Sequence, residues 1–315
     1  MTRRRLTELA IQLALLFGVA ALVFWLAQNV AVNLKARNLA SGFGFLDKTA
    51  GFQISQSLIA YSERSSYGRA LLVGLLNTLL VSGVGVVFAS LIGFAIGIAR
   101  RAENALLAGL AAIYVETLRN IPLLLQLFFW YFAVLRPLPG PQEAIDLFGL
   151  GYLSNRGLQL CAGSCPVLGR FNFEGGIAIR PEFLALVVAL STYTAAFIAE
   201  IVRAGLAAVP RGQREAAEAL GLSPRQTLWL VILPQALRVI IPPLAGQYLN
   251  LLKNSSLAVA IAFPDLVSVF AGTALSQSGQ AIEIVAITMA IYLGLSLVTA
   301  TAMNLYNRHI TRGER

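Results

Sequence analysis

The stretch "VPRGQREAAEALGLSPRQTLWLVILPQ", residues 209–235, is polar for most of its length although apolar segments flank it on both sides. Its first half, "QREAAEAL", consists of strong helix formers. Gly221 follows, and glycine readily takes the left-handed conformation that commonly ends a helix. The first half of the stretch therefore predicts a short helix that ends at a glycine turn.

A second helix start follows the glycine turn. Ser223 fits an N-cap, Pro224 fits the first helical position, and Gln226 fits the third position of a capping box. Pro234 cannot donate a backbone hydrogen bond and clashes with the preceding turn of a helix. We therefore expect two short helices around a glycine turn, the second ended or kinked at Pro234.

The composition of the whole chain indicates an integral membrane protein. The 315 residues are 57% hydrophobic and 12% charged, whereas soluble domains contain about 25% charged residues. Apolar segments long enough to span a bilayer predict six crossings and an all-α, polytopic fold. They occupy residues 9–31, 70–98, 104–135, 182–204, 236–263 and 280–304.

Two of these segments have unusual lengths. The first apolar run is longer than the ~7–15 residues of a signal-peptide core, so we interpret it as a retained helix. The third, at about 32 residues, would make a helix of roughly 48 Å against ~30 Å of hydrocarbon. Pro122, in "ETLRNIPLLLQL", is the expected point at which the third segment breaks.

The distribution of basic residues predicts the orientation. The net charge is +9, but the arginines are scattered between apolar blocks, which does not favour nucleic-acid binding. Arginines are concentrated in short segments beside the helix ends on one face, so the positive-inside rule places both termini and residues 209–235 in the cytoplasm. Residues 136–180 then lie outside, and their proline and glycine content predicts a loop with at most short structure.

The reactive side chains exclude several chemistries. Cys161 and Cys165, in "CAGSC", are the only cysteines, and with the distant His309 they cannot supply the four ligands of a zinc site. Whether they form a local disulfide is left open.

The stretch "GFGFLDKT" nearly matches a phosphate-binding loop, but Asp47 replaces its second glycine, so the chain is not expected to be an ATPase. No hydrolase or metalloenzyme motif is present either.

The stretch of residues 209–235 resembles the EAA loop of ABC-importer permeases. The resemblance rests on the spacing of Glu215, Ala216, Ala217, Gly221 and Pro234, with Val231 where the family has isoleucine. The blocks "GLLNTLLVS", "ETLRNIPLLLQLFFWYF", "YTAAFIAEIVRAG" and "LLKNSSLAVAIAFPDL" are similar to those of the polar amino-acid branch. The long N-terminal region and the insertion resemble the Q-type permeases of general L-amino-acid uptake systems.

The resemblance implies a type I ABC-importer fold in a bacterial inner membrane. It also implies that the chain is the permease subunit of an importer for L-amino acids. Residues 68–307 would form the transmembrane domain, preceded by a helix and an extracytoplasmic segment in 1–67 and followed by a cytoplasmic tail in 308–315. Two copies of a cytoplasmic ATPase would bind ATP and magnesium and dock on the EAA loop, so this chain would need no cofactor. An extracytoplasmic binding protein would deliver the amino acid, and a second homologous permease would complete a heterodimer.

Other functions remain open on the residues alone. A secondary transporter that works alone on an ion gradient commonly shows internal repeats and broken helices in both halves, of which only the broken third segment fits. A structural subunit without a transport path would not explain charged residues within the membrane spans. We therefore favour the importer permease and retain the ion-coupled transporter as the alternative.

Polar residues within the spans are candidates for the substrate path, because an amino-acid zwitterion needs donors and acceptors where little water is present. Glu116 and Arg203 are among the ionisable residues within the spans. Arg203 also lies three residues after Glu200, a spacing at which the two can pair on one face of a helix. Arg119 could instead satisfy carbonyls freed at Pro122. The candidates are Lys253, Asn254, Ser255, Asn250, Thr192, Tyr193, Glu200, Arg119, Gln126 and Asn77.

Overall fold

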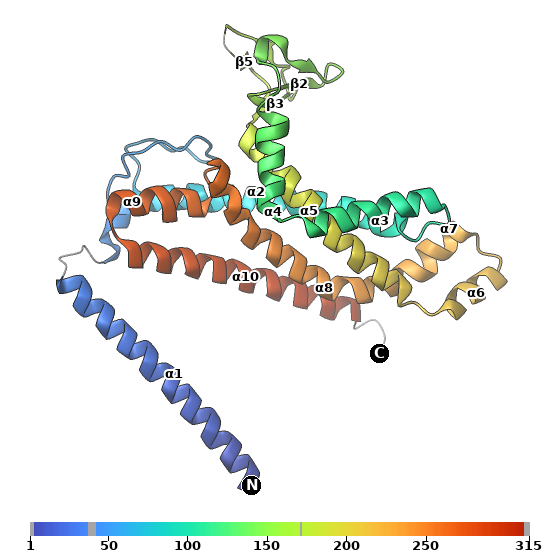
Figure 1. The fold of residues 1–315 in the computed structure, drawn as a ribbon, viewed down its shortest axis with the longest axis horizontal. Helices are drawn as coiled ribbons and strands as arrows, with labels where there is room; N and C mark the ends of the chain where they lie inside the picture. The colour runs from blue at the N-terminus through green and yellow to red at the C-terminus, as the bar shows by residue number, and fades with distance from the viewer. Residues whose placement is uncertain (1–2, 37–41, 171, 312–315) are drawn as a thin grey trace.

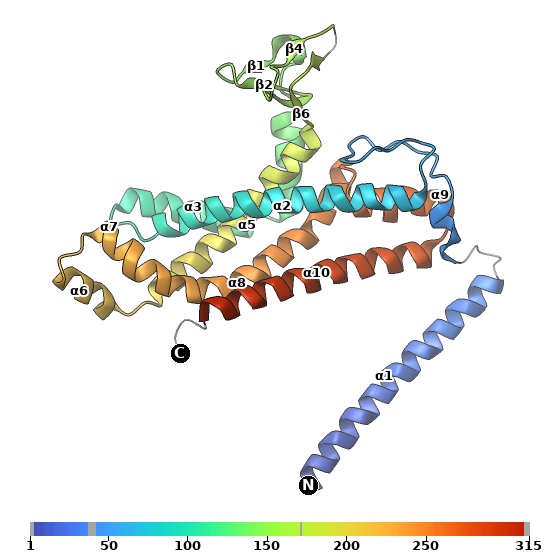
Figure 2. The same ribbon diagram turned by 180° about the vertical axis from the view of Figure 1, so that it is seen from behind.

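The computed structural model of the chain describes residues 3–36, 42–170 and 172–311, and the last four residues of the predicted tail lie outside this range. The described part is mainly helical (Figure 1). Its longer α-helices are α1 (Arg3–Ala36), α2 (Tyr67–Ala99), α3 (Ala105–Asn120), α5 (Pro181–Ala207), α6 (Arg211–Ala219), α8 (Leu233–Asn254) and α10 (Ala281–Thr311). Helix α1 runs apart from the other helices in both views (Figures 1 and 2).

The predicted crossings correspond to helices. In the described part of the chain, four helices are long and apolar enough to span a bilayer, and a bent pair adds a fifth if its two parts form one span. The first predicted crossing lies in α1, where the described apolar stretch, Ile11–Leu26, is shorter. The structure also contains an unpredicted helix between the last two crossings, formed by the π-helical segment η6 (Val267–Ala274) and α9 (Leu275–Ser278).

The third apolar segment is broken at the predicted proline. Helix α3 ends at Asn120, and α4 (Leu123–Phe128) continues as the π-helical segment η2 (Phe129–Leu135) after Pro122. The two parts meet at an angle of 104°. A proline cannot continue the hydrogen-bond ladder, and the residue before it is disfavoured in the helical conformation, so the chain turns here.

The centre of the helical body is formed by α2, α5 and α8, with α5 packed along both neighbours. Gly93 and Gly97 of α2 make the contact with α5 close. A β-carbon at Gly93 would lie 2.6 Å from the Cβ of Ile198, and one at Gly97 would lie 2.6 Å from the Cβ of Val202. The GxxxG spacing therefore lets the two helices approach to a distance that larger residues would prevent.

Among its described residues, the insertion at residues 136–180 contains only short elements, as predicted, and they pair into two small sheets. Four short strands form an antiparallel sheet in the order β1-β2-β3-β6, and β4 and β5 form a separate pair. The strands are β1 (Ile145–Asp146), β2 (Gly151–Ser154), β3 (Gly157–Leu160), β4 (Val167–Leu168), β5 (Phe173–Glu174) and β6 (Ile177–Ile179). The sheet projects from the helical body on η2 and the start of α5 (Figures 1 and 2), so the all-α prediction holds only for the rest of the described chain.

The prediction of a second short helix that ends or kinks at Pro234 was wrong in its extent. A helix of 38 residues runs from Pro224 to Ile261 through α7 (Pro224–Gln226), the π-helical segment η4 (Thr227–Ile232), α8 and the 3-10 segment η5 (Ser255–Ile261). Pro234 lies in the first turn of α8, directly after η4. The wider π-helical turn interrupts the regular ladder at this point, where the proline has no N–H to donate.

Candidate functional site

The EAA-like segment folds as a short helix with a defined end. Helix α6 is followed by Gly221 at a φ of +79°, the left-handed conformation predicted for this glycine. The N–H of Gly221 donates to the carbonyl of Glu218 at 2.9 Å, and the N–H of Leu222 donates to Ala217 at 3.1 Å. This pair of bonds is the Schellman motif, which satisfies carbonyl groups that the helix end leaves unpaired.

The next helix begins with the predicted capping box. The side chain of Ser223 accepts from the N–H of Gln226 at 3.4 Å, and the side chain of Gln226 accepts from the N–H of Ser223 at 2.9 Å. Pro224 occupies the first turn, where its missing N–H carries no penalty. The two helices and the turn between them are therefore determined by local interactions.

Helix α6 lies at one end of the helical body and exposes most of its surface (Figure 1). Only Ala217 is buried in this helix, whereas Glu215 and Ala216 are exposed. Leu220, just after the helix, has 82% of its surface exposed. A short helix with a charged face and a protruding leucine has the features of an element that docks on a partner.

A pocket of about 840 Å³ separates α6 from the ends of α2 and α5. Glu215 lines it, and Arg214 contacts Glu103 in the α2–α3 linker at 3.7 Å and Glu218 within α6 at 3.1 Å. On the other side, Gln213 contacts Gln235 at 3.3 Å. These exposed polar contacts are weak, so α6 is held by its two chain ends and by packing against η4, where Ala217 is buried.

A charged cluster joins α2 to α5 close to the same pocket. Arg203 pairs with Glu200 one turn away at 2.5 Å, as the spacing predicts, and Arg100 at the end of α2 pairs with the same carboxylate. The sequence did not indicate Arg100 as a partner, because it lies one hundred residues away. Glu200 and Arg203 are thus used in a contact between helices.

Gln126, and not Arg119, satisfies the carbonyls freed at Pro122. The side-chain amide nitrogen of Gln126 donates to the carbonyls of Leu118 at 2.8 Å and Ile121 at 3.0 Å. Arg119 is exposed, with its guanidinium 5.0 Å from the ring centre of Phe197. The proposed role of Arg119 in the break was therefore wrong.

Asn77 is fully buried and connects three segments. Its amide nitrogen donates to the carbonyls of Gln56 and Pro264, both at 2.8 Å. Next to it, the hydroxyl oxygen of Thr78 accepts from the N–H of Leu266 at 3.0 Å. In this conformation the donors of Asn77 are consumed by backbone groups.

The fully buried Asp265 lies in the same segment. One of its carboxylate oxygens accepts from the N–H of Ser268 at 2.8 Å, and the other has no partner among the described residues. Sequence reasoning missed Asp265, although a carboxylate between the apolar runs "AIAF" and "LVSVF" was a visible signal. The bonds of Thr78 and Asn77 to Leu266 and Pro264 hold this segment against α2, whereas the bond of Asp265 is local.

The remaining path candidates are divided between the surface and the interior. Ser255 is fully buried and donates to the carbonyl of Leu252 at 2.7 Å. Asn254 is half-buried, while Lys253 and Asn250 are exposed on α8. Lys253 lines a pocket of about 480 Å³ between α8 and α10. Only part of the predicted group is thus open to a solute in this conformation.

Thr192 and Tyr193 lie on the middle of α5 and are half-buried. The hydroxyl of Thr192 donates to the carbonyl of Val188 at 2.7 Å, and its own carbonyl accepts from the hydroxyl of Tyr114 at 2.8 Å. The ring of Tyr193 packs against Phe197 with centroids 5.0 Å apart. Glu116 is exposed at the end of α3.

In the insertion, a disulfide joins Cys161 to Cys165.

The family of the chain follows from comparison with known proteins. Residues 85–312 match the model of the binding-protein-dependent transport system inner membrane component. This range includes the α6 loop and all helices packed around α5 except the first part of α2. The chain belongs to this family. It is therefore a multi-pass inner membrane protein and a transport-system permease subunit with the type I ABC-importer fold.

Named relatives of this inner membrane component cover nearly its whole length. The general L-amino acid transport system permease protein AapQ of Rhizobium johnstonii is 48% identical over 93% of this chain and 89% of its own. The glutamate/glutamine/aspartate/asparagine transport system permease protein BztB of Rhodobacter capsulatus is 36% identical over 99% of this chain and 95% of its own.

Solved structures show the same fold. An amino acid ABC transporter crystallised with histidines contains a chain that is 28% identical, with a TM-score of 0.59, over 77% of this chain and 95% of that one. The MetNI methionine ABC transporter in an inward-facing form matches with 20% identity and a TM-score of 0.54. About a quarter of the inner membrane component thus has no counterpart in either structure.

Proposed function

We propose that this chain is the membrane subunit of an ABC importer that carries L-amino acids across the bacterial inner membrane. The names of its relatives support amino acids as the substrate class, and the 48% identity to a general L-amino-acid permease supports a broad range. The substrate enters from a binding protein on the outside, as the family description implies. Both termini lie in the cytoplasm, in agreement with the distribution of arginines.

The single observation that carries the proposal is α6. This helix is exposed, is ended by the Schellman motif at Gly221, and carries Glu215, Ala216 and Ala217 with the spacing of the EAA loop. We infer that α6 docks on a separate cytoplasmic ATPase, present in two copies, which binds ATP and magnesium. This chain itself has no catalytic role in the proposal and holds no cofactor.

A second, homologous permease completes the assembly as a heterodimer in this proposal. Exposed Lys253 and Asn250 on α8, with the pocket beside Lys253, form this chain's side of the transport path. Asn254, Thr192 and Tyr193 are their half-buried neighbours. Glu200, Arg119, Gln126, Asn77 and Ser255 stay candidates for a conformation in which their present contacts open.

Reconstitution in proteoliposomes tests the proposal. With the ATPase, the second permease and the binding protein present, we expect ATP-dependent amino-acid uptake that Glu215→Lys or Gly221→Asp abolishes without loss of membrane insertion. Both changes alter the exposed docking surface and leave the helical body unchanged. Glu63→Lys reverses an exposed charge on the opposite side and serves as the matched control.

Two results would overturn the assignment. Uptake by this chain alone on an ion gradient would establish the alternative, a secondary transporter. Normal substrate-stimulated ATP hydrolysis by both α6 variants would remove the proposed docking role.

A further inference from the structure

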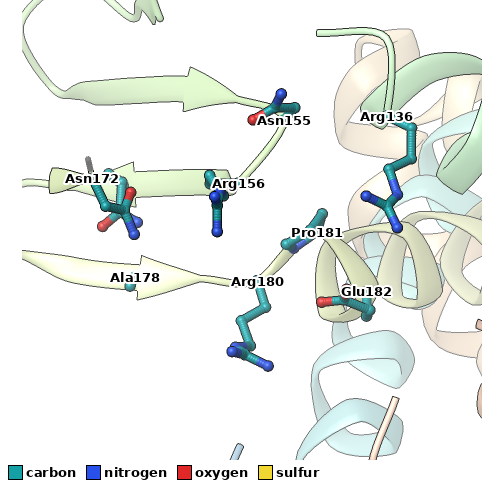
Figure 3. Close-up of a pocket in the computed structure, with 9 residues that line it drawn as sticks. Arg136, Asn155, Arg156, Asn172, Ala178, Arg180, Pro181 and Glu182 are labelled. Carbon is teal, nitrogen blue, oxygen red and sulfur yellow. The ribbon is translucent and has the colours of Figure 1, made fainter. Parts of the chain in front are cut away.

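A pocket of about 500 Å³ lies where the sheet of the insertion meets the helical body (Figure 3). Three arginines from different elements line it. Arg136 follows η2, Arg156 lies in the turn between β2 and β3, and Arg180 connects β6 to α5. All three are exposed. The pocket is therefore a concave, basic site on the face that the arginine distribution places outside the cell membrane.

The arginines have little to neutralise them. Among the described residues, Glu182 is the only carboxylate that lines the pocket, and it accepts a hydrogen bond from the hydroxyl of Tyr131 at 3.0 Å. In residues 42–170 and 172–311, none of the three arginines makes an ion pair; Arg136 instead lies 5.4 Å from the ring centre of Tyr131. Three guanidinium groups and one carboxylate line the pocket, and this excess of positive charge favours an anion.

The sheet holds two of the arginines close together. Gly157 is next to Arg156, and Ile179 is next to Arg180. Gly157 has a φ of +104°, and a β-carbon there would lie 2.1 Å from the carbonyl oxygen of Ile179, so the two backbones are close. Leu158 also pairs with Ile179 across the sheet. Both arginines line the same pocket, so a bound anion would reduce the repulsion between their charges.

The lining favours a polar anion over a lipid. Apart from Ala178 and Pro181, the pocket is lined by charged and amide side chains, among them Asn155 and the buried Gln159. It offers little apolar surface for a lipid chain, and the insertion projects from the helical body (Figures 1 and 2). Arginine binds carboxylates and phosphates in a bidentate manner, and a protein partner presents carboxylates on its aspartate and glutamate side chains.

We propose that the pocket lined by Arg136, Arg156 and Arg180 receives an aspartate or glutamate side chain from the surface of the extracytoplasmic binding protein. This inference rests on the proposed function, and it assigns the insertion a docking role. Complementary charge at such a surface accelerates association and fixes the orientation of the partner.

The test uses the complete transporter in proteoliposomes with the amino-acid-loaded binding protein that stimulates its ATP hydrolysis. We expect the double variant Arg156→Glu/Arg180→Glu to raise the concentration of binding protein at half-maximal stimulation roughly tenfold or more, because it replaces attraction by repulsion. Raising the salt concentration should weaken the wild type and not the variant. Arg156→Gln/Arg180→Gln, which only removes the charges, should give a smaller increase and covers the case in which reversal impairs folding.

Lys48→Glu is the control, because Lys48 is an exposed cation in the other segment of the outer face, outside the pocket. It should leave the half-maximal concentration within twofold of the wild type. Equal values for the wild type and both arginine variants would overturn the proposal. The proposal would also be overturned if the variants bound less well to anionic phosphatidylglycerol vesicles while the binding protein still stimulated their ATP hydrolysis as in the wild type. That result would assign the pocket to lipid. A wild type that no binding protein stimulates would instead refute the proposed function.

Discussion

Arg100, the residue after α2, forms an ion pair with Glu200 on α5, and the two side chains are only 15% and 29% exposed. The carboxylate of Glu200 also accepts from Arg203. Two arginines from different helices thus share one acid at the end of the body from which α6 extends. The cluster connects the helix pair of the central core to the segment that we propose contacts the ATPase.

Glu200→Gln should destabilise the protein by about 1–3 kcal/mol, between the values for exposed and buried ion pairs. The change leaves Arg100 and Arg203 close together without a neutralising charge. The measurement is the apparent unfolding temperature in detergent. Arg101→Gln, at the exposed neighbouring position, removes a charge without breaking the cluster and should change stability by less than about 0.5 kcal/mol. Equal unfolding temperatures for both variants would argue against a structural role of the cluster.

Gln126→Leu should be destabilising even though leucine suits an apolar site. The substitution leaves the carbonyls of Leu118 and Ile121 without their donor, at about 1–3 kcal/mol for a buried group. Asn120→Ala, which removes an exposed amide at the same break, should cost much less. Thermal unfolding of the two variants side by side checks this. If Asn120→Ala proved the more harmful, Gln126 would not be the residue that stabilises the bend.

Gly97→Ala and Gly83→Ala make the same change in one helix with opposite expected effects. At Gly97 the new methyl would lie 2.6 Å from Val202 and 2.8 Å from the carbonyl oxygen of Ala199, so overpacking should cost about 1–3 kcal/mol. At Gly83 nothing lies within 4 Å, and better helix propensity should stabilise by up to about 1 kcal/mol. Unfolding temperatures that shift in the same direction would contradict the close α2–α5 contact.

Local features of the chain were predicted well because their causes lie within a few residues. The left-handed Gly221 and the capping box at Ser223 depend on neighbouring backbone groups, and the break at Pro122 depends on a missing N–H. The exposure of α6 followed from its polar composition. For the same reason the EAA spacing was readable without a structure.

Contacts between distant segments were not predicted, because their causes lie in residues that are far apart in the sequence. Pro234 did not end its helix, because a π-helical turn precedes it and α8 packs against α5. Strands of two to four residues in the insertion are too short to show a pattern, and pairing with each other stabilises them. Arg119 and Gln126 both lie near the break, and only the tertiary structure shows which one reaches the carbonyls.

The sequence by itself determined the membrane class, the apolar helices, and the glycine turn and capping box of residues 209–235, because apolar length and helix capping are local properties. Only the tertiary structure decided how the polar residues are used. It paired Arg100 with Glu200 and gathered Arg136, Arg156 and Arg180 around one pocket. Such groups depend on how helices and strands from separate parts of the chain pack, since that packing brings together charges that are far apart in sequence.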